Sequence, residues 1–171
     1  NQSEIDMMAR QFEQQGHEIV ATPDEADEIV VNTCAVTNEA TRSSRKLIRE
    51  LHRANDSAPI NVTGCYAQIN PDDIAVIDGV QRVINNIEKA DLVTQITGEK
   101  TELFDLEPHE REVRLGAMGR TRAFIKVQDG CDNACTFCIT TVARGDGQSR
   151  NVDEIINEIQ YLYSTGYQEA V

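Results

Sequence analysis

The sequence predicts an α/β fold, in which an open parallel sheet with helices on both faces precedes the first β/α unit of a partial barrel. Three observations support this prediction. Short apolar stretches alternate with helical patterns over residues 3–97, and a charged stretch without sustained periodicity follows over residues 98–121. A strand, a loop, a helix and the start of another strand then occupy residues 122–171. We therefore expect a first domain over residues 1–97, a linker over 98–121 and the truncated start of a second domain over 122–171.

Helical and strand patterns follow one another through the first domain. Gly16 ends the first helix, and Pro71 stands at a favourable early position of a later helix. The run Ile29-Val30-Val31 is typical of a buried strand. The expected helices span residues 3–15, 36–54, 72–77 and 87–96, and the expected strands span residues 17–20, 28–32, 60–63 and 81–84.

The second part begins after a linker whose Pro and Gly residues allow a short hairpin. Residues 123–128 are expected to form a strand that leads directly into a cysteine motif. Asn151 is the expected N-cap of a helix that Gly166 ends, and residues 167–171 resemble the start of a further strand. One face of that helix is apolar, with Val152, Ile155, Ile156, Ile159, Leu162 and Tyr163.

Composition restricts the function classes. The chain has 29 acidic and 16 basic residues and a formal net charge of −13, which argues against a general nucleic-acid binder. Binding to RNA would require a local basic patch or another domain. The five cysteines are an odd number, which favours a reduced, cytoplasmic setting over a disulfide framework. No stretch approaches the roughly 20 apolar residues of a membrane-spanning helix, so we expect no membrane association.

Three cysteines, Cys131, Cys135 and Cys138, have the spacing C-x-x-x-C-x-x-C. Three thiolates can hold three irons of a [4Fe–4S] cluster and leave the fourth iron open to a small molecule. The alternative is zinc, which usually takes four protein ligands. No histidine lies within the motif, and His109 in the linker is the nearest in the sequence. Ligand number and spacing therefore favour the cluster over zinc.

The other two cysteines each follow an expected strand. Cys34 comes directly after Val30-Val31-Asn32-Thr33, and Cys65 comes after Asn61-Val62-Thr63-Gly64. Ligands of open parallel sheets bind beyond the carboxyl ends of the strands, so these two thiols are expected to converge there. Gly64 allows a close backbone approach. The alternative is that both are ordinary buried thiols without a ligand role.

Together these motifs resemble the radical S-adenosylmethionine (radical SAM) methylthiotransferases over essentially the whole chain. The matching runs are Asn32-Thr33-Cys34-Ala35-Val36-Thr37, Thr63-Gly64-Cys65 and Gly130-Cys131-Asp132-Asn133-Ala134-Cys135-Thr136-Phe137-Cys138. The continuation through Asn38-Glu39-Ala40, with Ser44-Arg45-Lys46, is most similar to the threonylcarbamoyladenosine tRNA subgroup. Arg144-Gly145 and Ser149-Arg150 match a loop that follows the cysteine motif in this family.

The resemblance implies two [4Fe–4S] clusters and S-adenosylmethionine as cofactors. Cys131, Cys135 and Cys138 would bind the cluster that cleaves S-adenosylmethionine, while Cys34 and Cys65 would bind an auxiliary cluster. No catalytic residue is expected beyond these ligands. Phe137 matches an aromatic position beside the adenine, although it can also be a core residue.

The implied reaction is methylthiolation at C2 of N6-threonylcarbamoyladenosine, beside the anticodon of tRNA. An electron donor such as a flavodoxin would be a partner, and the sulfur donor is left unassigned. The alternatives within the family are isopentenyladenosine in tRNA and an aspartate of a ribosomal protein. An alternative from another class is a non-catalytic zinc or electron-transfer module.

The resemblance also implies that the chain is a fragment. In the family, a third auxiliary cysteine precedes the segment that matches Asn1-Gln2, and an RNA-binding domain usually follows the barrel. We therefore expect this fragment to be inactive by itself.

One further feature does not depend on the resemblance. Five cations share a narrow arc of the expected helix over residues 36–54, whereas Val36, Ala40, Leu47 and Leu51 line its other side. These cations, called the basic stripe below, are Arg42, Arg45, Lys46, Arg49 and Arg53. The stripe is a candidate contact for tRNA phosphates. The alternative is a solvated face balanced by Glu39 and Glu50.

Overall fold

The fold was analysed in a computed structural model that describes residues 2–99, 122–164 and 166–171. A three-stranded parallel sheet forms the centre of the first domain, with strand order β1-β2-β3. The strands are β1 (Ile29–Thr33), β2 (Ile60–Gly64) and β3 (Val80–Val83).

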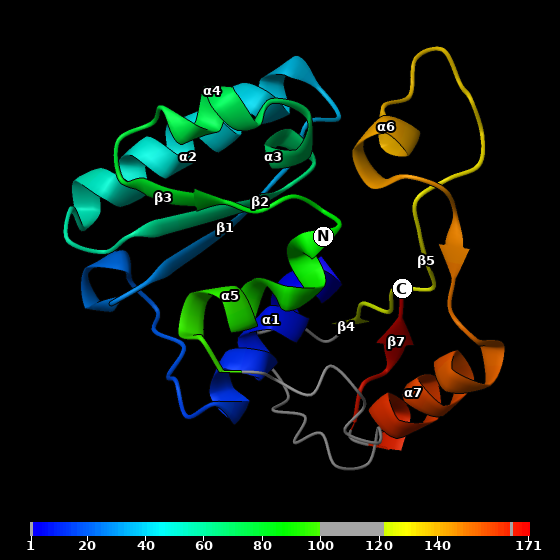
Figure 1. The fold of residues 1–171 in the computed structure, drawn as a ribbon. Coiled ribbons are helices and arrows are strands. Elements are labelled where there is room, and N and C mark those ends of the chain that lie inside the picture. The colour runs from blue at the N-terminus through cyan, green and yellow to red at the C-terminus, as the bar shows by residue number, and fades with distance from the viewer. Residues whose placement is uncertain (1, 100–121, 165) are drawn as a thin grey trace.

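Helices cover both faces of this sheet (Figure 1). On one face lie α2 (Asn38–Ala54), α3 (Cys65–Ile69) and α4 (Pro71–Ala75), and on the other lie α1 (Gln2–Gln14) and α5 (Leu92–Thr97). Short 3-10 helices span Pro23–Glu25 (η1) and Glu88–Asp91 (η2). The predicted α/β class with a two-faced parallel sheet is therefore confirmed.

The alternation of side chains along β1 creates the two cores. Ile29 and Val31 pack with Ile48 of α2 in the larger core. Val30 faces the other way, against a smaller core that contains Met8 of α1. The larger core is completed by Ala58, Ile60, Val62, Tyr66, Ala67, Ile74 and Ile77, and the smaller by Ile84, Leu92 and Val93.

The second part contains short elements and no closed barrel among its described residues. Its strands are β4 (Arg122–Ala123), β5 (Gln128–Asp129), β6 (Gln148–Ser149) and β7 (Glu169–Ala170), and its helices are α6 (Thr140–Arg144) and α7 (Val152–Ser164). Strand β4 pairs in parallel with β7, while β5 pairs antiparallel with β6.

Two predicted elements of the first domain differ from the structure, and one observed helix was not predicted. Residues 17–20 are not a strand: the His17 N–H donates to the Phe12 carbonyl at 3.0 Å, and Ile19 is 52% exposed without a strand partner. Helix α2 begins at Asn38, because the Thr37 hydroxyl caps it by accepting from the Ala40 N–H at 3.0 Å. Val36 therefore lies outside the helix and is exposed, and α3 was not predicted.

The second part differs in the predicted strand over residues 123–128. The structure divides it between β4 and β5, which pair with different partners. The predicted cap of α7 is present, with the Asn151 Oδ1 accepting from the Asp153 N–H at 2.8 Å. No residue of α7 is buried, so its predicted apolar face lies largely exposed. The predicted linker hairpin lies in residues 100–121, outside the described residues.

Candidate metal centre

Strand register places Cys34 and Cys65 at adjacent strand ends. Thr33 of β1 pairs with Gly64 of β2, and each cysteine is the next residue in its chain segment. Cys65 begins α3 and is 6% exposed, whereas Cys34 is half-buried. The carbonyl of Cys34 accepts a hydrogen bond from the Ser44 hydroxyl of α2 at 3.5 Å. The structure thus brings the two strand ends together, while the ligand role of the thiols stays a prediction.

Gly64 makes this approach possible. Its φ is +97°, and a Cβ there would lie 2.3 Å from the Thr33 carbonyl oxygen and 2.5 Å from the Asn32 Oδ1. The Thr33 hydroxyl donates to the Thr63 carbonyl at 2.6 Å and accepts from the Ala67 N–H at 3.3 Å. These bonds attach the end of β1 to both β2 and α3.

The other three cysteines lie in one loop between β5 and α6. Hydrogen bonds with α6, with the residue after it and within the loop itself shape this segment. The Thr141 hydroxyl donates to the carbonyls of Cys131 at 2.9 Å and Asn133 at 3.0 Å. The Cys131 N–H donates to the Gly145 carbonyl at 3.1 Å, and the Cys138 N–H donates to the Cys135 carbonyl at 3.2 Å. Cys131 is half-buried, and Cys135 and Cys138 are exposed.

Polar groups reach two of these sulfurs. The Asn133 amide donates to the Cys131 Sγ at 3.4 Å, and the Cys138 Sγ lies 3.2 Å from the Thr140 hydroxyl oxygen. Hydrogen bonds with the Thr140 hydroxyl and backbone lower the pKa of the Cys138 thiol, which favours the thiolate that binds metal. Phe137 is 92% exposed, so it is not a core residue of this chain.

The donor set of the loop fits an iron–sulfur cluster in type and number, because it offers three thiols and no competing histidine. Within residues 2–99, 122–164 and 166–171, no three His, Cys, Asp or Glu residues are grouped closely enough to hold a metal ion. The cysteine ligands therefore stay predictions from the motif.

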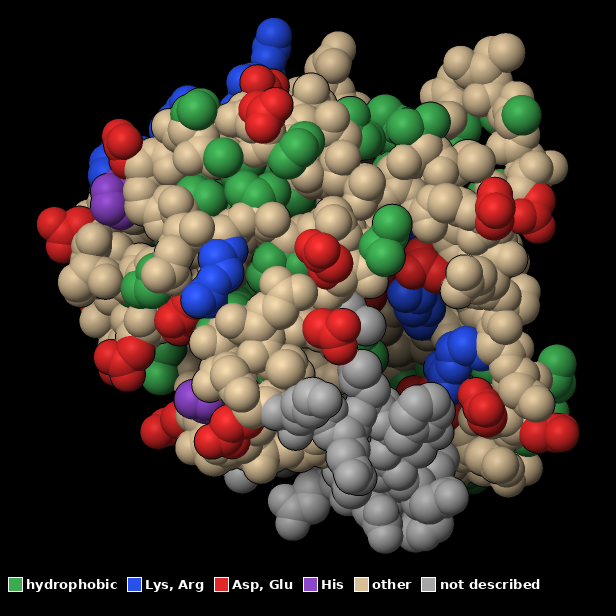
Figure 2. All heavy atoms as spheres, viewed as in Figure 1, with side chains coloured by type: hydrophobic (Ala, Val, Ile, Leu, Met, Phe, Trp, Pro, Cys, Tyr) green, Lys and Arg blue, Asp and Glu red, His purple; other side chains and the backbone are tan. Residues whose placement is uncertain are grey.

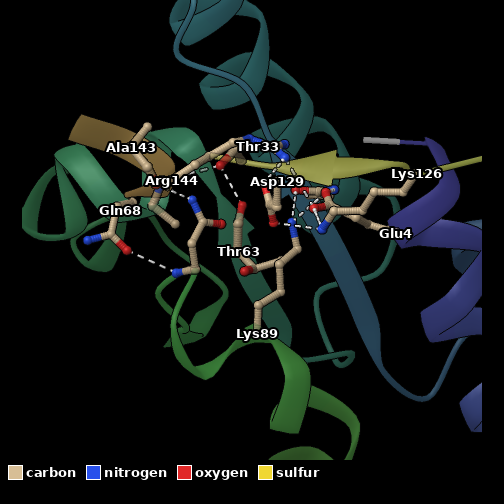
Figure 3. A network of polar contacts seen from close by, with 12 residues as sticks. Glu4, Thr33, Thr63, Gln68, Lys89, Lys126, Asp129, Ala143 and Arg144 are labelled. Carbon is tan, nitrogen blue, oxygen red and sulfur yellow. Dashed lines mark hydrogen bonds and ion pairs between the residues drawn. The ribbon is translucent and has the colours of Figure 1, made fainter. Parts of the chain in front are cut away.

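A buried ion-pair network lies between the two parts of the chain (Figure 3). Glu4 of α1 is 4% exposed and forms ion pairs with Lys89 at 2.8 Å, Lys126 at 3.2 Å and Arg144 at 3.4 Å. Asp129 pairs with Lys126 at 2.6 Å and with Arg144 at 2.8 Å. Acidic and basic side chains also lie together in the recess between the two parts in Figure 2. A cleft of about 290 Å³ there is lined by Ser3, Glu4, Phe124, Ile125, Lys126, Val127, Gln128, Arg144 and Val171.

The charges in this network change the pKa values of its members. Burial raises the pKa of Glu4, but the hydrogen bond and charge of Lys89, with Arg144 and Lys126, outweigh burial and lower it to about 2. Burial, with the charges of Arg144 and Lys126, lowers the pKa of Lys89 below its ordinary value even though Glu4 raises it. Burial also raises the pKa of Asp129, but hydrogen bonds from Lys126 and Arg144 bring it below its usual value.

Arg144 contacts the cysteine site as well as the carboxylates. Burial lowers the pKa of its guanidinium, but hydrogen bonds to Asp129 and Cys65 raise it above its ordinary value overall. Sequence reasoning noted Arg144 only as part of a matching loop and did not single out Glu4, Lys89, Lys126 or Asp129. Glu4 shares a helix face with Met8, and a carboxylate on an apolar face is the signal that could have pointed to a buried pair.

The basic stripe lies on α2, away from the core side of that helix. Its residues are exposed except for the half-buried Arg45, and the buried side of α2 centres on Ser44 and Ile48. Leu47, expected on the apolar side, is 45% exposed. Lys46 forms an exposed ion pair with Glu50 at 3.6 Å. Lys and Arg side chains are visible along the edge of the molecule near α2 in Figure 2.

Comparison with known proteins assigns the chain to a family. Residues 1–94 match the model of the family described as "Uncharacterized protein family UPF0004". The chain belongs to the UPF0004 family. This match covers the sheet domain with Cys34 and Cys65 and ends before the loop of Cys131, Cys135 and Cys138.

Relatives of this UPF0004 chain carry methylthiotransferase names. It is 36% identical to the threonylcarbamoyladenosine tRNA methylthiotransferase of Aquifex aeolicus, in an alignment covering all of the chain and 44% of that protein. The identity is also 36% with the protein of that name from Bacillus subtilis, covering all of the chain and 40% of the relative. With the ribosomal protein uS12 methylthiotransferase of Crocosphaera subtropica it is 32%, over 92% of the chain and 38% of the relative. The chain thus spans less than half the length of these relatives. Across its described ranges, no helix combines the length and apolar character needed to cross a membrane.

Proposed function

We propose that this chain is part of a radical SAM tRNA methylthiotransferase that modifies C2 of N6-threonylcarbamoyladenosine beside the anticodon. The observation that carries the proposal is the 36% identity over the whole chain to tRNA methylthiotransferases of that name. The three-cysteine loop offers three thiols for one cluster, and the two cysteines at adjacent strand ends offer two thiols for another.

The cysteines have separate roles in this proposal. Cys131, Cys135 and Cys138 would hold a [4Fe–4S] cluster whose open iron binds S-adenosylmethionine. Cys34 and Cys65 would hold two irons of an auxiliary [4Fe–4S] cluster. When bound, the first cluster supplies the electron that cleaves S-adenosylmethionine, which is needed because acid–base chemistry does not remove an unactivated aromatic hydrogen.

Other residues of the chain orient these ligands. Asn133 donates to the Cys131 sulfur, and the Thr141 hydroxyl donates to two backbone carbonyls within the loop. Exposed Phe137 is available to stack against the adenine of S-adenosylmethionine. The low exposure of Cys65 limits water access to the auxiliary site.

The proposed partners follow from this reaction. The substrate is tRNA, and the basic stripe would contact phosphates of its anticodon arm. An electron donor such as a flavodoxin would reduce the cluster. The reduced state that such clusters require is consistent with a cytoplasmic enzyme.

The first test uses the full-length protein, reconstituted anaerobically with iron and sulfide. Its EPR spectrum is recorded with and without S-adenosylmethionine, and we expect a reduced [4Fe–4S] signal that changes on addition. The matched control replaces Cys131, Cys135 and Cys138 with alanine and should keep only a signal that S-adenosylmethionine does not alter. Bound zinc without iron in the unsubstituted protein would contradict the proposal and leave a non-catalytic metal module.

The second test identifies the substrate. The reconstituted protein is incubated with S-adenosylmethionine, a reductant, a sulfide source and tRNA that contains either threonylcarbamoyladenosine or isopentenyladenosine. Nucleoside mass spectrometry should detect a methylthio product only from the first tRNA. A product only from the second would replace the proposed substrate.

A ribosomal protein is the second candidate substrate, and the 32% identity to a uS12 methylthiotransferase supports its inclusion. The same incubation with ribosomal protein S12 tests it by peptide mass spectrometry. A methylthio group on an aspartate of that protein, with unmodified tRNA, would favour this candidate over the proposed one.

A further inference from the structure

Helix α6 contacts both cysteine sites. Its Thr141 hydroxyl donates to the Cys131 carbonyl at 2.9 Å, and the next residue after the helix, Gly145, accepts from the Cys131 N–H at 3.1 Å. On its other side α6 packs against α3, which begins with Cys65. A short helix in the second part thus connects the three-cysteine loop with the strand-end cysteine of the first domain.

Arg144, the last residue of α6, completes this connection. Its guanidinium lies 2.8 Å from Asp129, 3.4 Å from the buried carboxylate of Glu4, and also hydrogen-bonds with Cys65. Asp129 directly precedes the three-cysteine loop, and Glu4 belongs to the first domain. Figure 3 shows Arg144 between α3 and the carboxylates of the network. One planar group with several donors is suited to hold three acceptors at once.

We propose that Arg144 is a positioning residue of the auxiliary site, whose guanidinium donates to the Cys65 sulfur and holds it in a fixed place relative to the three-cysteine loop. This inference rests on the proposed function, because it assumes that Cys65 is a cluster ligand. The carboxylates of Glu4 and Asp129 orient the guanidinium, so the hydrogen bond to sulfur is directed before a cluster binds.

This arrangement has a redox consequence that a purely structural contact lacks. A reduced cluster carries one more negative charge than the oxidised cluster. A nearby cation that hydrogen-bonds a ligand sulfur stabilises the reduced form and makes the potential less negative. Removing the guanidinium should therefore make the auxiliary cluster harder to reduce.

The test measures the auxiliary cluster alone, in full-length protein in which Cys131, Cys135 and Cys138 are replaced by alanine. EPR-monitored redox titration is carried out with Arg144, Arg144→Gln and Arg144→Lys in this background. We expect a more negative midpoint potential with Arg144→Gln and a smaller shift with Arg144→Lys, which keeps the charge and loses the planar fork. The comparison variant is Glu4→Gln, which removes one of the carboxylates that orient the guanidinium but leaves the donor to Cys65 in place, and it should shift the potential less than Arg144→Gln does.

A second measurement does not require a cluster. Metal-free full-length protein is treated with iodoacetamide, and labelling of Cys65 relative to Cys34 is followed by peptide mass spectrometry. Arg144→Gln should change the ratio of Cys65 labelling to Cys34 labelling several-fold, because the Cys65 sulfur loses both the cation that hydrogen-bonds with it and the cover that this side chain provides. Glu4→Gln should change the ratio much less.

Equal labelling rates in Arg144→Gln and Glu4→Gln, with no change in potential, would show that Arg144 only joins the two parts of the chain and would overturn the proposal. Failure of the unsubstituted protein to form an auxiliary cluster would instead contradict the proposed function. The labelling comparison would then still decide whether Arg144 holds Cys65.

Discussion

Gly64 is the last residue of β2, and its backbone conformation determines the position of Cys65, the next residue. Its φ of +97° and ψ of −172° lie in a region that residues with a Cβ rarely adopt. The Thr33 carbonyl and the Asn32 side chain occupy the space that a Cβ would need. The close approach of the two cysteine-bearing strand ends therefore depends on one missing methyl group.

Gly64→Ala should lower the free energy of unfolding by about 3 kcal/mol or more, because strain and a backbone clash add. The matched control is Gly16→Ala, where φ is +84° and nothing lies within 4 Å of the added Cβ. That variant should lose only about 1 kcal/mol from the backbone conformation alone. Urea unfolding followed by circular dichroism measures both, and equal losses would contradict the clash.

Glu4 gives the stability of the chain a defined acid dependence. Its pKa in the folded state is about 2, compared with 4.5 for the unperturbed group. Because the folded pKa is the lower one, the stabilisation is present above pH 4.5 and is lost as the pH falls towards 2. Burial lowers the pKa of Lys89, which is the opposite of the usual effect of a carboxylate partner. The Glu4 shift therefore decides the behaviour in acid.

The lowered pKa of Glu4 is expected to contribute on the order of 3 kcal/mol to the free energy of unfolding near neutral pH. Glu4→Gln should accordingly be less stable than the unsubstituted chain at pH 6, and the two should converge as the pH approaches 2. Urea unfolding at several pH values measures this difference, with Glu28→Gln as a comparison outside the network. A difference that stays constant from pH 6 to pH 2.5 would rule out the lowered pKa.

Helix α2 has a buried side that packs on the sheet and an exposed side that carries the basic stripe. Ile48 is buried against the sheet, while most of the cations are exposed. Within the part of the chain that the structure describes, Lys46 is the stripe residue with an ion pair, to Glu50 at 3.6 Å, and exposed pairs of this kind contribute little to stability. The stripe thus remains available to an anionic partner.

Charge reversal of Arg45 and Arg49 in the full-length protein should weaken tRNA binding. If each residue contacts one phosphate, the slope of log affinity against log salt should become less steep by about 2. The matched control reverses Arg82 and Arg122, which changes the net charge equally at other places on the chain. Filter binding over a salt series measures both, and equal effects of the two pairs would show a general charge effect.

The elements show what a sequence can and cannot predict. The strand–helix alternation was predictable because β1, β2 and α2 carry clear apolar periods. Helix α3 was missed because it follows β2 without any loop. The strand predicted over 123–128 was wrong because its ends pair with segments far along the chain, which a local pattern does not reveal.

One part of the candidate site could be predicted from the sequence and another could not. Adjacent positions for Cys34 and Cys65 could be predicted because parallel strands end at one edge of a sheet. The ion-pair network could not, because Glu4 lies 85 residues from Lys89 and 140 residues from Arg144. Its partners are specified by the packing of α1 and α6, and each charge in isolation resembles an ordinary surface residue.

The molecule as a whole concentrates its apolar core in the first domain. Ile48 is fully buried there, whereas Ile159 on α7 is 40% exposed. The described second part contributes only Ala123 and Ala143 to the buried apolar residues. The stability of the chain should therefore depend mainly on the three-stranded sheet and its helices.

Two matched substitutions, each of which shortens an isoleucine side chain to alanine, test where the core lies. Ile48→Ala should cost about 2–5 kcal/mol of unfolding free energy, because it removes contacts and leaves a cavity. Ile159→Ala, the same chemical change on α7, should cost under about 1 kcal/mol. Chemical denaturation of both variants provides the comparison, and a larger loss for Ile159→Ala would place the core elsewhere.

Glu4 also imposes an order of events during protein synthesis. Its first cation, Lys89, is made 85 residues later, Lys126 122 residues later and Arg144 140 residues later. At about 5–20 residues per second, roughly 7–28 s pass between the synthesis of Glu4 and that of Arg144. The three-stranded sheet and its helices can therefore fold on the ribosome while Glu4 still lacks its partners from the second part. Glu4 is fully paired only after the segment with Cys131, Cys135 and Cys138 has been translated.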